Sequence, residues 1–389
     1  WRLKEEAFLK DISWLDELKV RASTGRTGTQ NLGDNLFYSL YSPASYASAN
    51  ALIPKQLGND LIRWETTTQN DLGLDFELFG SRLRGALGYY EKKNSNLLML
   101  MNTPWSSGFS SVMKNVANID NKGIEIDLRG DIVRTSNFNW NLAINVSANR
   151  SKVSKILQDF SDPKVGAQTD AYIREQILGN TILREGSPVG LMFGYQYTGN
   201  IQNQEQLEAY QEASILARYG FLQNIGIGYP MYAMNEEGFY KGHFKRDVIG
   251  SGEPNYYGGI TNSVTYKDFN LIATFTFSQG GDIMYLPAIK SFGLGDRGNT
   301  NTLILEQSYT DEHTDAKRPG LLLGEPNNVG ASGSSNIAVF DGSYIKLKNI
   351  TLNYRIPQNW MQKLRLNEGM LYASANNLFA ITNYPCPDP

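Results

Sequence analysis

A strict alternation of apolar and polar residues over residues 121–153 constrains the fold of this chain more than any other feature. Apolar side chains occupy every second position over 124–128 and again over 140–148. The side chains of a β-strand point alternately to the two faces of a sheet. The pattern therefore predicts two long strands, each with one apolar and one polar face. The short polar segment 131–137 lies between them, which predicts a hairpin.

The same alternation recurs along the chain and predicts about nine antiparallel strands. Tight turns, such as Gly80-Ser81 and Lys267-Asp268, join some neighbours. Every second connection is tight, so the long connections are expected to emerge together from one end of the sheet. They lie near residues 25–60, 99–118, 157–254 and 278–341.

The connection 157–254 is the longest and is expected to contain structure of its own. A helix is predicted over residues 203–218, ended by Gly220. An extra pair of strands is possible near 172–197, which would raise the strand count to eleven.

Strands of about ten residues, joined by short turns at one end and long loops at the other, are typical of a transmembrane β-barrel. Two alternatives remain: a soluble antiparallel β-sandwich that acts as an enzyme or lectin, and a passive porin or adhesin barrel. Long loops gathered at one end are uncommon in compact soluble domains. We therefore predict an all-β, transmembrane antiparallel β-barrel, with the apolar faces toward lipid and the polar faces toward the lumen.

Composition excludes several other functions. The net charge of −3 does not indicate a nucleic-acid partner. No apolar run reaches the roughly 18 residues of a membrane helix. Cys386 is the only cysteine, and with His243 and His313 it cannot form a Cys/His metal cluster. We expect no cofactor and no metal site.

Pairs of carboxylates lie two positions apart on the predicted lumen faces: Asp75 with Glu77, and Glu125 with Asp127. Such pairs can act as general acid and base. A hydrated lumen of mixed charge explains them better, and we find no nucleophile with a partner base. We therefore expect no catalytic residue and no enzyme activity. The counter-ions expected for these carboxylates are Arg82, Arg84 and Arg129.

Several short sequence motifs, taken together, resemble those of the SusC/RagA-type TonB-dependent transporters of the outer membrane of Bacteroidetes-type bacteria. They are spread over nearly the whole chain in the order of the family. Examples are Arg63-Trp-Glu-Thr-Thr-Thr, Asn121-Lys-Gly-Ile-Glu-Ile, Val248-Ile-Gly, Ser343-Tyr-Ile-Lys-Leu-Lys and Ala375-Asn-Asn-Leu-Phe.

The resemblance implies a 22-stranded barrel that holds an N-terminal plug. Residues 1–389 would then be the C-terminal part of one barrel domain, about half of the barrel, without the plug and the TonB-contacting segment. The resemblance also implies a SusD-like surface lipoprotein as lid, energy from the TonB complex, and a dimer of SusC–SusD pairs. The expected substrate is an oligosaccharide, with an oligopeptide as the alternative.

Aromatic residues in or beside the long loops are the candidates for substrate binding, because aromatic faces suit sugar rings and apolar peptide side chains alike. The alternative is that they form the interfacial aromatic girdle or pack loop on loop. The candidates are Trp105, Phe109, Tyr229, Tyr232, Tyr256 and Tyr257.

Overall fold

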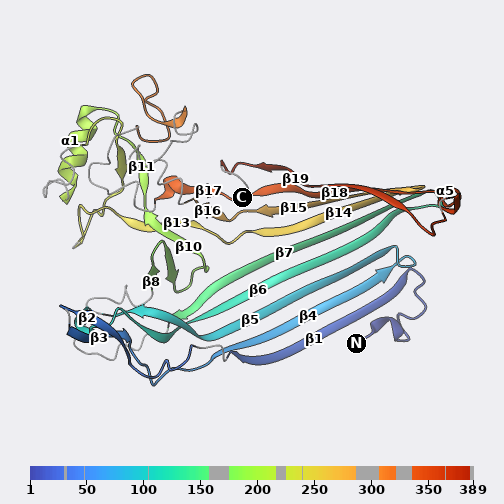
Figure 1. Cartoon of the computed structure of the whole chain (residues 1–389), viewed down its shortest axis with the longest axis horizontal. Coiled ribbons are helices and arrows are strands. Elements are labelled where there is room, and N and C mark those ends of the chain that lie inside the picture. The colour runs from blue at the N-terminus through green and yellow to red at the C-terminus, as the bar shows by residue number, and fades with distance from the viewer. Residues whose placement is uncertain are drawn as a thin grey trace.

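Nine strands form one antiparallel sheet that runs the length of the molecule (Figure 1). Their order in the sheet is β1-β4-β5-β6-β7-β14-β15-β18-β19, so each strand pairs with the next long strand along the chain. The predicted count of nine is confirmed. The computed structural model describes residues 1–29, 33–47, 49–103, 105–156, 175–215, 225–238, 240–285, 306–320, 335–363 and 365–385.

The strands of this sheet are long, and the longest belong to the ribbon β5-β6-β7. The hairpin predicted from residues 121–153 is formed by β6 and β7. The bounds are β1 Leu15–Thr29, β4 Glu65–Leu78, β5 Leu83–Asn102, β6 Ser111–Arg134, β7 Phe138–Ile156, β14 Tyr256–Tyr266, β15 Phe269–Gln279, β18 Tyr344–Arg355 and β19 Met370–Thr382.

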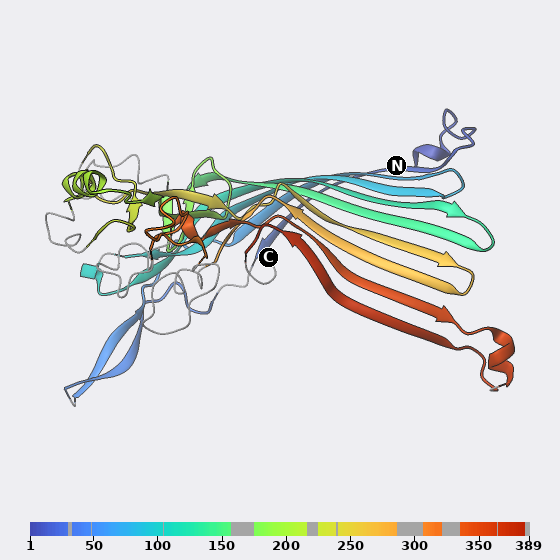
Figure 2. The same cartoon turned by 90° about the horizontal axis from the view of Figure 1, so that it is seen from above.

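All tight turns lie at one end of the sheet, here called the turn end, and the long connections lie at the other, the loop end (Figures 1 and 2). A six-residue helix, α5 (Gln358–Lys363), fills the last connection at the turn end. The loop predicted over 99–118 is shorter than expected, because β5 and β6 stay paired as far as Asn102 and Ser111.

The turn between β4 and β5 also differs from the two-residue turn predicted at Gly80-Ser81. It takes four residues, 79–82, and Phe79, Gly80 and Ser81 all have positive φ. Its geometry is supported from outside the turn. Phe79 donates its N–H to the Trp14 carbonyl at 2.8 Å, and the Ser81 N–H donates to Asp16.

Smaller elements occupy the long connections. A hairpin of β2 (Leu40–Tyr46) and β3 (Ala49–Gln56) projects away from the sheet at the loop end (Figure 2). Helix α1 (Gln204–Ala213) begins where the sequence predicts, with Asn203 accepting the Gln206 N–H at 2.9 Å. It is shorter than predicted, and Gly220 lies outside the described residues. In the part of the chain that the structure describes, the single-turn helices are η1 (Leu3–Glu5), η2 (Trp105–Ser107) and η4 (Asn336–Ala338).

The strands expected near 172–197 do not widen the barrel sheet. They belong to a separate four-stranded sheet, here called the loop sheet, with the order β13-β10-β9-β8. Two further pairs, β11-β12 and β16-β17, also lie at the loop end. The bounds are β8 Glu175–Leu178, β9 Thr181–Arg184, β10 Leu191–Tyr195, β11 Tyr197–Asn200, β12 Pro230–Tyr232, β13 Arg246–Ser251, β16 Asp282–Met284 and β17 Val339–Asp341.

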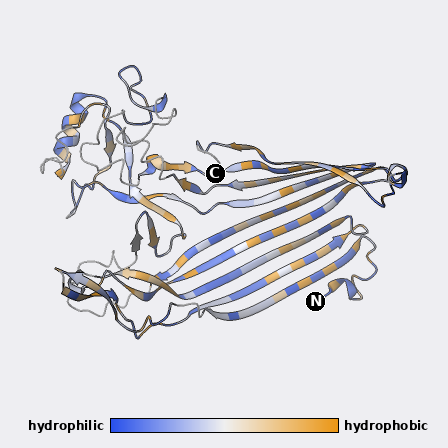
Figure 3. Ribbon diagram, viewed as in Figure 1, coloured by the Kyte–Doolittle hydropathy of each residue, from blue (hydrophilic) through white to orange (hydrophobic). Residues whose placement is uncertain are grey.

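Cross-strand register gives the sheet two different faces, visible as the alternating colours along each strand in Figure 3. Leu128, Ile144 and Ile260 pair in one row and lie on the same face. The next row, Asp127 with Asn145, lies on the opposite face. We call the apolar face the outer face and the polar face the inner face.

None of the described residues covers the outer face along the strands. Leu72 is 55% exposed, Ile124 54% and Leu371 62%. The buried clusters of the described residues lie at the loop end instead, around Val153, Ile182 and Tyr232. A water-soluble sandwich would bury its apolar face in a core, so this arrangement rejects the sandwich alternative.

No helix among the described residues is long and apolar enough to span a membrane.

A charge on the outer face of the central strand should be costly. In lipid, Ile144→Lys is expected to destabilise the folded barrel by about 2–4 kcal/mol, since Ile144 lies between Leu128 and Ile260 on the apolar face. Asn145→Lys is the control, because Asn145 lies on the inner face beside Asp127. Equilibrium unfolding by urea in lipid vesicles measures both. Equal losses for the two variants would contradict the assignment of faces.

Candidate functional site

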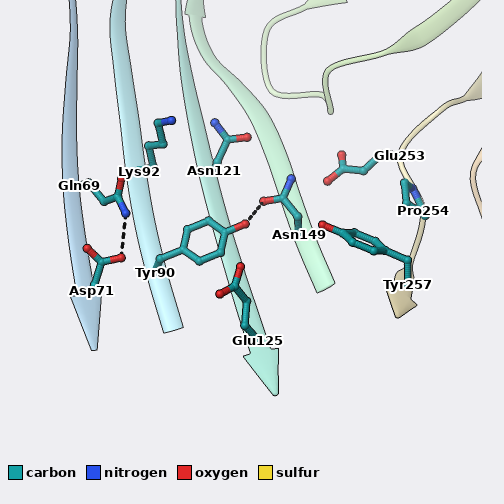
Figure 4. A pocket seen from close by; sticks show the side chains of 10 residues that line it. All are labelled: Gln69, Asp71, Tyr90, Lys92, Asn121, Glu125, Asn149, Glu253, Pro254 and Tyr257. Atoms are coloured by element: carbon teal, nitrogen blue, oxygen red, sulfur yellow. Dashed lines mark hydrogen bonds between the residues drawn. The ribbon is translucent and has the colours of Figure 1, made fainter. Parts of the chain in front are cut away.

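An open hollow of about 530 Å³ lies on the inner face, where β4 to β7 approach the loop end. Its lining is polar and comes from five separate parts of the chain (Figure 4). We call it the wall groove. It is lined by Gln69, Asp71, Tyr90, Lys92, Asn121, Glu125, Asn149, Glu253, Pro254 and Tyr257.

Tyr90 is the central side chain of the wall groove, and a glycine makes room for it. Tyr90 on β5 pairs with Gly123 on β6, and a Cβ atom at position 123 would overlap the Tyr90 ring. The ring can therefore lie across β6 and reach β7. There its hydroxyl donates to Asn149 Oδ1 at 2.9 Å, as Figure 4 shows. Gly123 belongs to the Asn-Lys-Gly-Ile-Glu-Ile motif. The glycine of this motif is explained by the space that the Tyr90 ring requires.

Most inner-face carboxylates nearer the turn end are already paired. Arg21 holds Asp75 through two contacts of 2.8 Å, and Arg129 lies 3.3 Å from Asp127. The expected counter-ion role is confirmed for Arg129. It is wrong for Arg84, whose Nε donates to the Ser81 carbonyl.

Arg82 likewise donates to a carbonyl, that of Asp131, at 3.5 Å. The neighbouring strand supplied the cations for Asp75 instead. Lys19 and Arg21 come from β1, and Arg21 lies opposite Gly73, which leaves room for its guanidinium.

Glu125 differs from these paired carboxylates. Within the described part of the chain it has neither a hydrogen bond nor an ion pair, and it extends into the wall groove below Tyr90 (Figure 4). Among the described residues, the partners of Asp71 are both neutral: Gln69 and Ser23. Three carboxylates and a single ammonium group, Lys92, therefore line the groove, which favours ligands that donate hydrogen bonds or carry positive charge.

The loop-end rim of the wall groove is held by Glu253. Its two carboxylate oxygens accept the N–H and the hydroxyl of Ser151 at 2.7 and 2.8 Å. The same hydroxyl accepts the Val189 N–H at 3.0 Å. One serine on β7 thus joins the segment before β14 to the segment before β10.

A second hollow of about 450 Å³ continues the wall groove toward the loop end. It shares Asn121, Asn149 and Glu253 with the groove and adds the apolar side chains of Leu97, Ile119 and Val189. The loop sheet is attached above it, since Val153 and Ile156 at the end of β7 form a buried cluster with Leu183 of β9. The two hollows together form one path along the wall.

An ion-pair network stiffens the loop sheet. Arg184 of β9 lies 3.3 Å from Asp247 of β13, and Lys245 lies 3.8 Å from it. Partial burial disfavours the charged carboxylate, but the Val248 N–H bond and the two cations outweigh burial, so the pKa of Asp247 is lowered.

The six aromatic candidates fall into different environments. Tyr257 of β14 lines the wall groove and points toward Asn149 (Figure 4). Tyr256, the preceding residue, lies on the outer face, and its ring centroid is 6.3 Å from that of Phe277. Two neighbours on one strand are thus divided between lumen and lipid.

The remaining candidates lie in the loops. Tyr232 is 6% exposed and packs against Phe244. Phe109 packs against Tyr41 of β2, with 6.0 Å between the two ring centroids. Tyr229 is half-buried, and its carbonyl accepts the Ile201 N–H. Trp105 begins η2, and its side chain lies outside the described part of the structure.

Of the ten groove residues, only Tyr257 was among the aromatic candidates. The nine others include four strand residues: Tyr90, Asn149, Asn121 and Gln69. The alternation places them on the inner face, but it does not rank one inner-face residue above another. The glycine that pairs with Tyr90 is the signal that could have found this position, because it shows that a large ring needs space there.

Comparisons with known proteins agree with an outer-membrane barrel. The family model for the β-barrel of TonB-dependent receptor-like proteins matches residues 11–378. TonB-dependent receptor P3 of Formosa agariphila is 31% identical over the whole chain, and TonB-dependent receptor SusC of Bacteroides thetaiotaomicron is 26% identical. The chain spans 37% of the length of each of these relatives.

A solved structure of the RagAB peptide transporter shares the fold. It superposes with a TM-score of 0.73 at 20% identity, covering 98% of this chain and 39% of that one. The exposed apolar face and the long connections gathered at one end are those of the wall of a transmembrane β-barrel. The family match places this barrel in the outer membrane. The chain belongs to the β-barrel domain of the TonB-dependent receptor family.

Filling the space at Gly123 should displace Tyr90. We expect Gly123→Ala to cost about 1–3 kcal/mol of stability, as overpacking does. In a Tyr90→Ala background the same change should be neutral or slightly stabilising, since alanine restricts the unfolded chain. A double-mutant cycle by urea unfolding in lipid vesicles measures the difference. Equal costs in both backgrounds would show that the ring does not occupy this space.

Acid should loosen the loop sheet through Asp247. Its lowered pKa means that the stabilisation is present above the pKa of the unfolded chain and is lost as pH falls through the folded value. The protection factors of the backbone amides in β10 and β13, which correct for the intrinsic pH dependence of hydrogen exchange, should therefore fall at low pH. Asp247→Asn should remove this pH dependence, whereas Glu237→Gln, at an exposed position, should leave it unchanged. Retention of the full pH dependence in Asp247→Asn would refute the assignment.

Proposed function

We propose that this chain forms part of a TonB-dependent importer that moves a nutrient oligomer across the outer membrane. An oligosaccharide is the first candidate for this substrate. The wall groove is the observation that carries the proposal. It presents two tyrosines, Tyr90 and Tyr257, on either side of Asn149 on the inner face (Figure 4). Transport requires no bond to be made or broken, so the protein acts as a carrier and not as an enzyme.

The chemistry of the groove supports an oligosaccharide. Carboxylates accept hydrogen bonds from sugar hydroxyls, and carboxamides both donate and accept them. A tyrosine combines an apolar ring face with a polar hydroxyl, which suits the two sides of a sugar ring. The carboxamides of Asn121 and Asn149, with Glu125, lie within one hollow beside Tyr90 and Tyr257.

An oligopeptide is the second candidate. The groove carries three carboxylates and one ammonium group, which favours a basic peptide, and its continuation is lined by the apolar Leu97, Ile119 and Val189. The RagAB protein, which shares the fold, is named a peptide transporter. Binding measurements with neutral oligosaccharides and with basic peptides of similar length distinguish the two substrates.

The gathering of long connections at the loop end supports a partner on that side. We assign this end to a SusD-like surface lipoprotein that closes over the barrel, as the family resemblance implies. The same resemblance assigns opening of the path to the TonB complex, and it suggests a dimer of transporter–lipoprotein pairs. The oligomeric state of the complex purified in mild detergent tests the last point.

Substitution at Tyr257 is the sharpest test of the groove. We expect Tyr257→Ala to weaken substrate binding and uptake about tenfold, or about 1.4 kcal/mol, because one ring face is lost. Tyr256→Ala is a matched control, since Tyr256 lies next to it on the outer face. Uptake of labelled oligosaccharide by cells measures both variants. An equal effect of the two substitutions would contradict binding in the groove.

Dependence on energy separates an importer from a passive porin. Uptake through an importer should stop in cells that lack the TonB complex, and it should stop when a protonophore collapses the proton gradient. Diffusion through a passive porin would continue in both cases. Continued uptake without the TonB complex would therefore reject the proposed mechanism while leaving the groove assignment open to the Tyr257 test.

A further inference from the structure

The outer face changes abruptly from apolar to charged across three neighbouring strands. Register sets the rows. Leu87, Ile126 and Val146 pair across β5, β6 and β7, and the next row toward the loop end is Tyr89, Ile124 and Ala148. The two rows above these consist entirely of charged residues. They are Glu91, Lys122 and Arg150, followed by Lys93, Asp120 and Lys152.

This boundary marks the upper limit of the lipid-facing surface on β5 to β7. Ile124 is 54% exposed and Tyr89 44% exposed, directly below the charged rows. An aromatic ring at such a height is typical of the membrane–water interface. The charged rows therefore lie at the level of the lipid headgroups on the loop side of the membrane.

The basic charge in these rows is only partly neutralised. Glu91 lies 3.5 Å from Lys122 and 3.7 Å from Lys93, so two ammonium groups share one carboxylate. Their side chains remain 57% and 52% exposed. Asp120 accepts a hydrogen bond from Ser154. Lys152, although opposite Asp120, forms no ion pair within the described residues.

Arg150 contributes a fixed positive charge. Its Nη1 donates to the carbonyls of Asn149, Pro254 and Asn255 at 2.7 to 3.1 Å, and its Nη2 donates to Asn255 Oδ1. These acceptors hold the guanidinium in place but carry no net charge. Four basic and two acidic side chains thus leave the two rows with a net charge of +2.

The positive charge is local to this part of the outer face. On the other side of β7 the paired strands end below the charged rows, and their outer-face residues nearest the loop end are uncharged: Tyr256 on β14, Gln279 on β15, Ile345 on β18 and Ile381 on β19. On β4 and β1 the two rows continue with Asn70 and Thr24, and with Thr68 and Arg26, so Arg26 is the one charged residue there. A ring of evenly distributed charge would only mark the water boundary. A single positive patch above an apolar surface is complementary to an anionic amphiphile instead.

We infer that Lys93, Lys122, Arg150 and Lys152 form a binding patch for the phosphate groups of an anionic glycolipid in the loop-side leaflet, whose acyl chains lie on the apolar rows below. Ammonium and guanidinium groups form charge-assisted bonds with phosphate oxygens. The patch depends on the position of the chain in the outer membrane and not on the transported substrate.

The test uses the intact transporter in detergent with EDTA, so that no divalent cation bridges lipid and protein. Diphosphoryl lipid A and its dephosphorylated counterpart are added, and native mass spectrometry counts the lipid retained. We expect the wild type to retain the phosphorylated lipid at least about tenfold better. The variant with Lys93→Gln, Lys122→Gln and Lys152→Gln should lose this preference, and added salt should weaken it in the wild type.

A charge-matched variant controls for net charge. Lys19→Gln, Arg84→Gln and Arg129→Gln remove three positive charges from the inner face and should leave retention of the lipid unchanged. Circular dichroism establishes that each variant keeps its β-structure. Equal retention of both lipids by the wild type, or equal losses in the two triple variants, would overturn the inference. Displacement of the lipid by micromolar inorganic phosphate would assign the patch to a free anion and overturn it as well.

Discussion

The continuous antiparallel hydrogen-bond ladder is the interaction on which the rest of this structure depends. Hydrocarbon offers no partner for a backbone N–H or C=O group, so a chain that crosses lipid by strands must pair each strand with its neighbours. Pairing runs unbroken in order from β1 to β19. The apolar outer face would promote aggregation in water, and in the membrane it is the face that lipid stabilises.

Fixed register converts this ladder into specific sites on each face. Once Tyr90 is opposite Gly123, its ring can cross β6 and reach Asn149, and the wall groove forms around that contact. The same register stacks Lys122 beside Arg150 on the outer face. A shift by one residue would exchange the two faces and remove both sites.

The sequence-based predictions succeeded where the signal is local and failed where it depends on neighbouring strands. Alternation within one strand was sufficient to place Glu125 on the inner face and Ile144 on the outer face. The ion partner of Asp75 was predicted on the wrong strand, because β1 and β4 are separated by more than thirty residues in the chain. Among the aromatic candidates, Tyr256 and Tyr257 are adjacent residues of the same type beside the same long loop, so the search for aromatic loop residues did not distinguish them.

The sequence by itself determined the class of structure: the strands, the hairpins, the two faces of each strand, and the position of the long loops at one end of the sheet. These follow from a period of two and from turn spacing, which are properties of neighbouring residues. Only the tertiary structure decided which residues meet across strands and how the loops fold above them. Those contacts depend on register and on packing between distant segments, such as Ser151 with Glu253, and no local pattern specifies them.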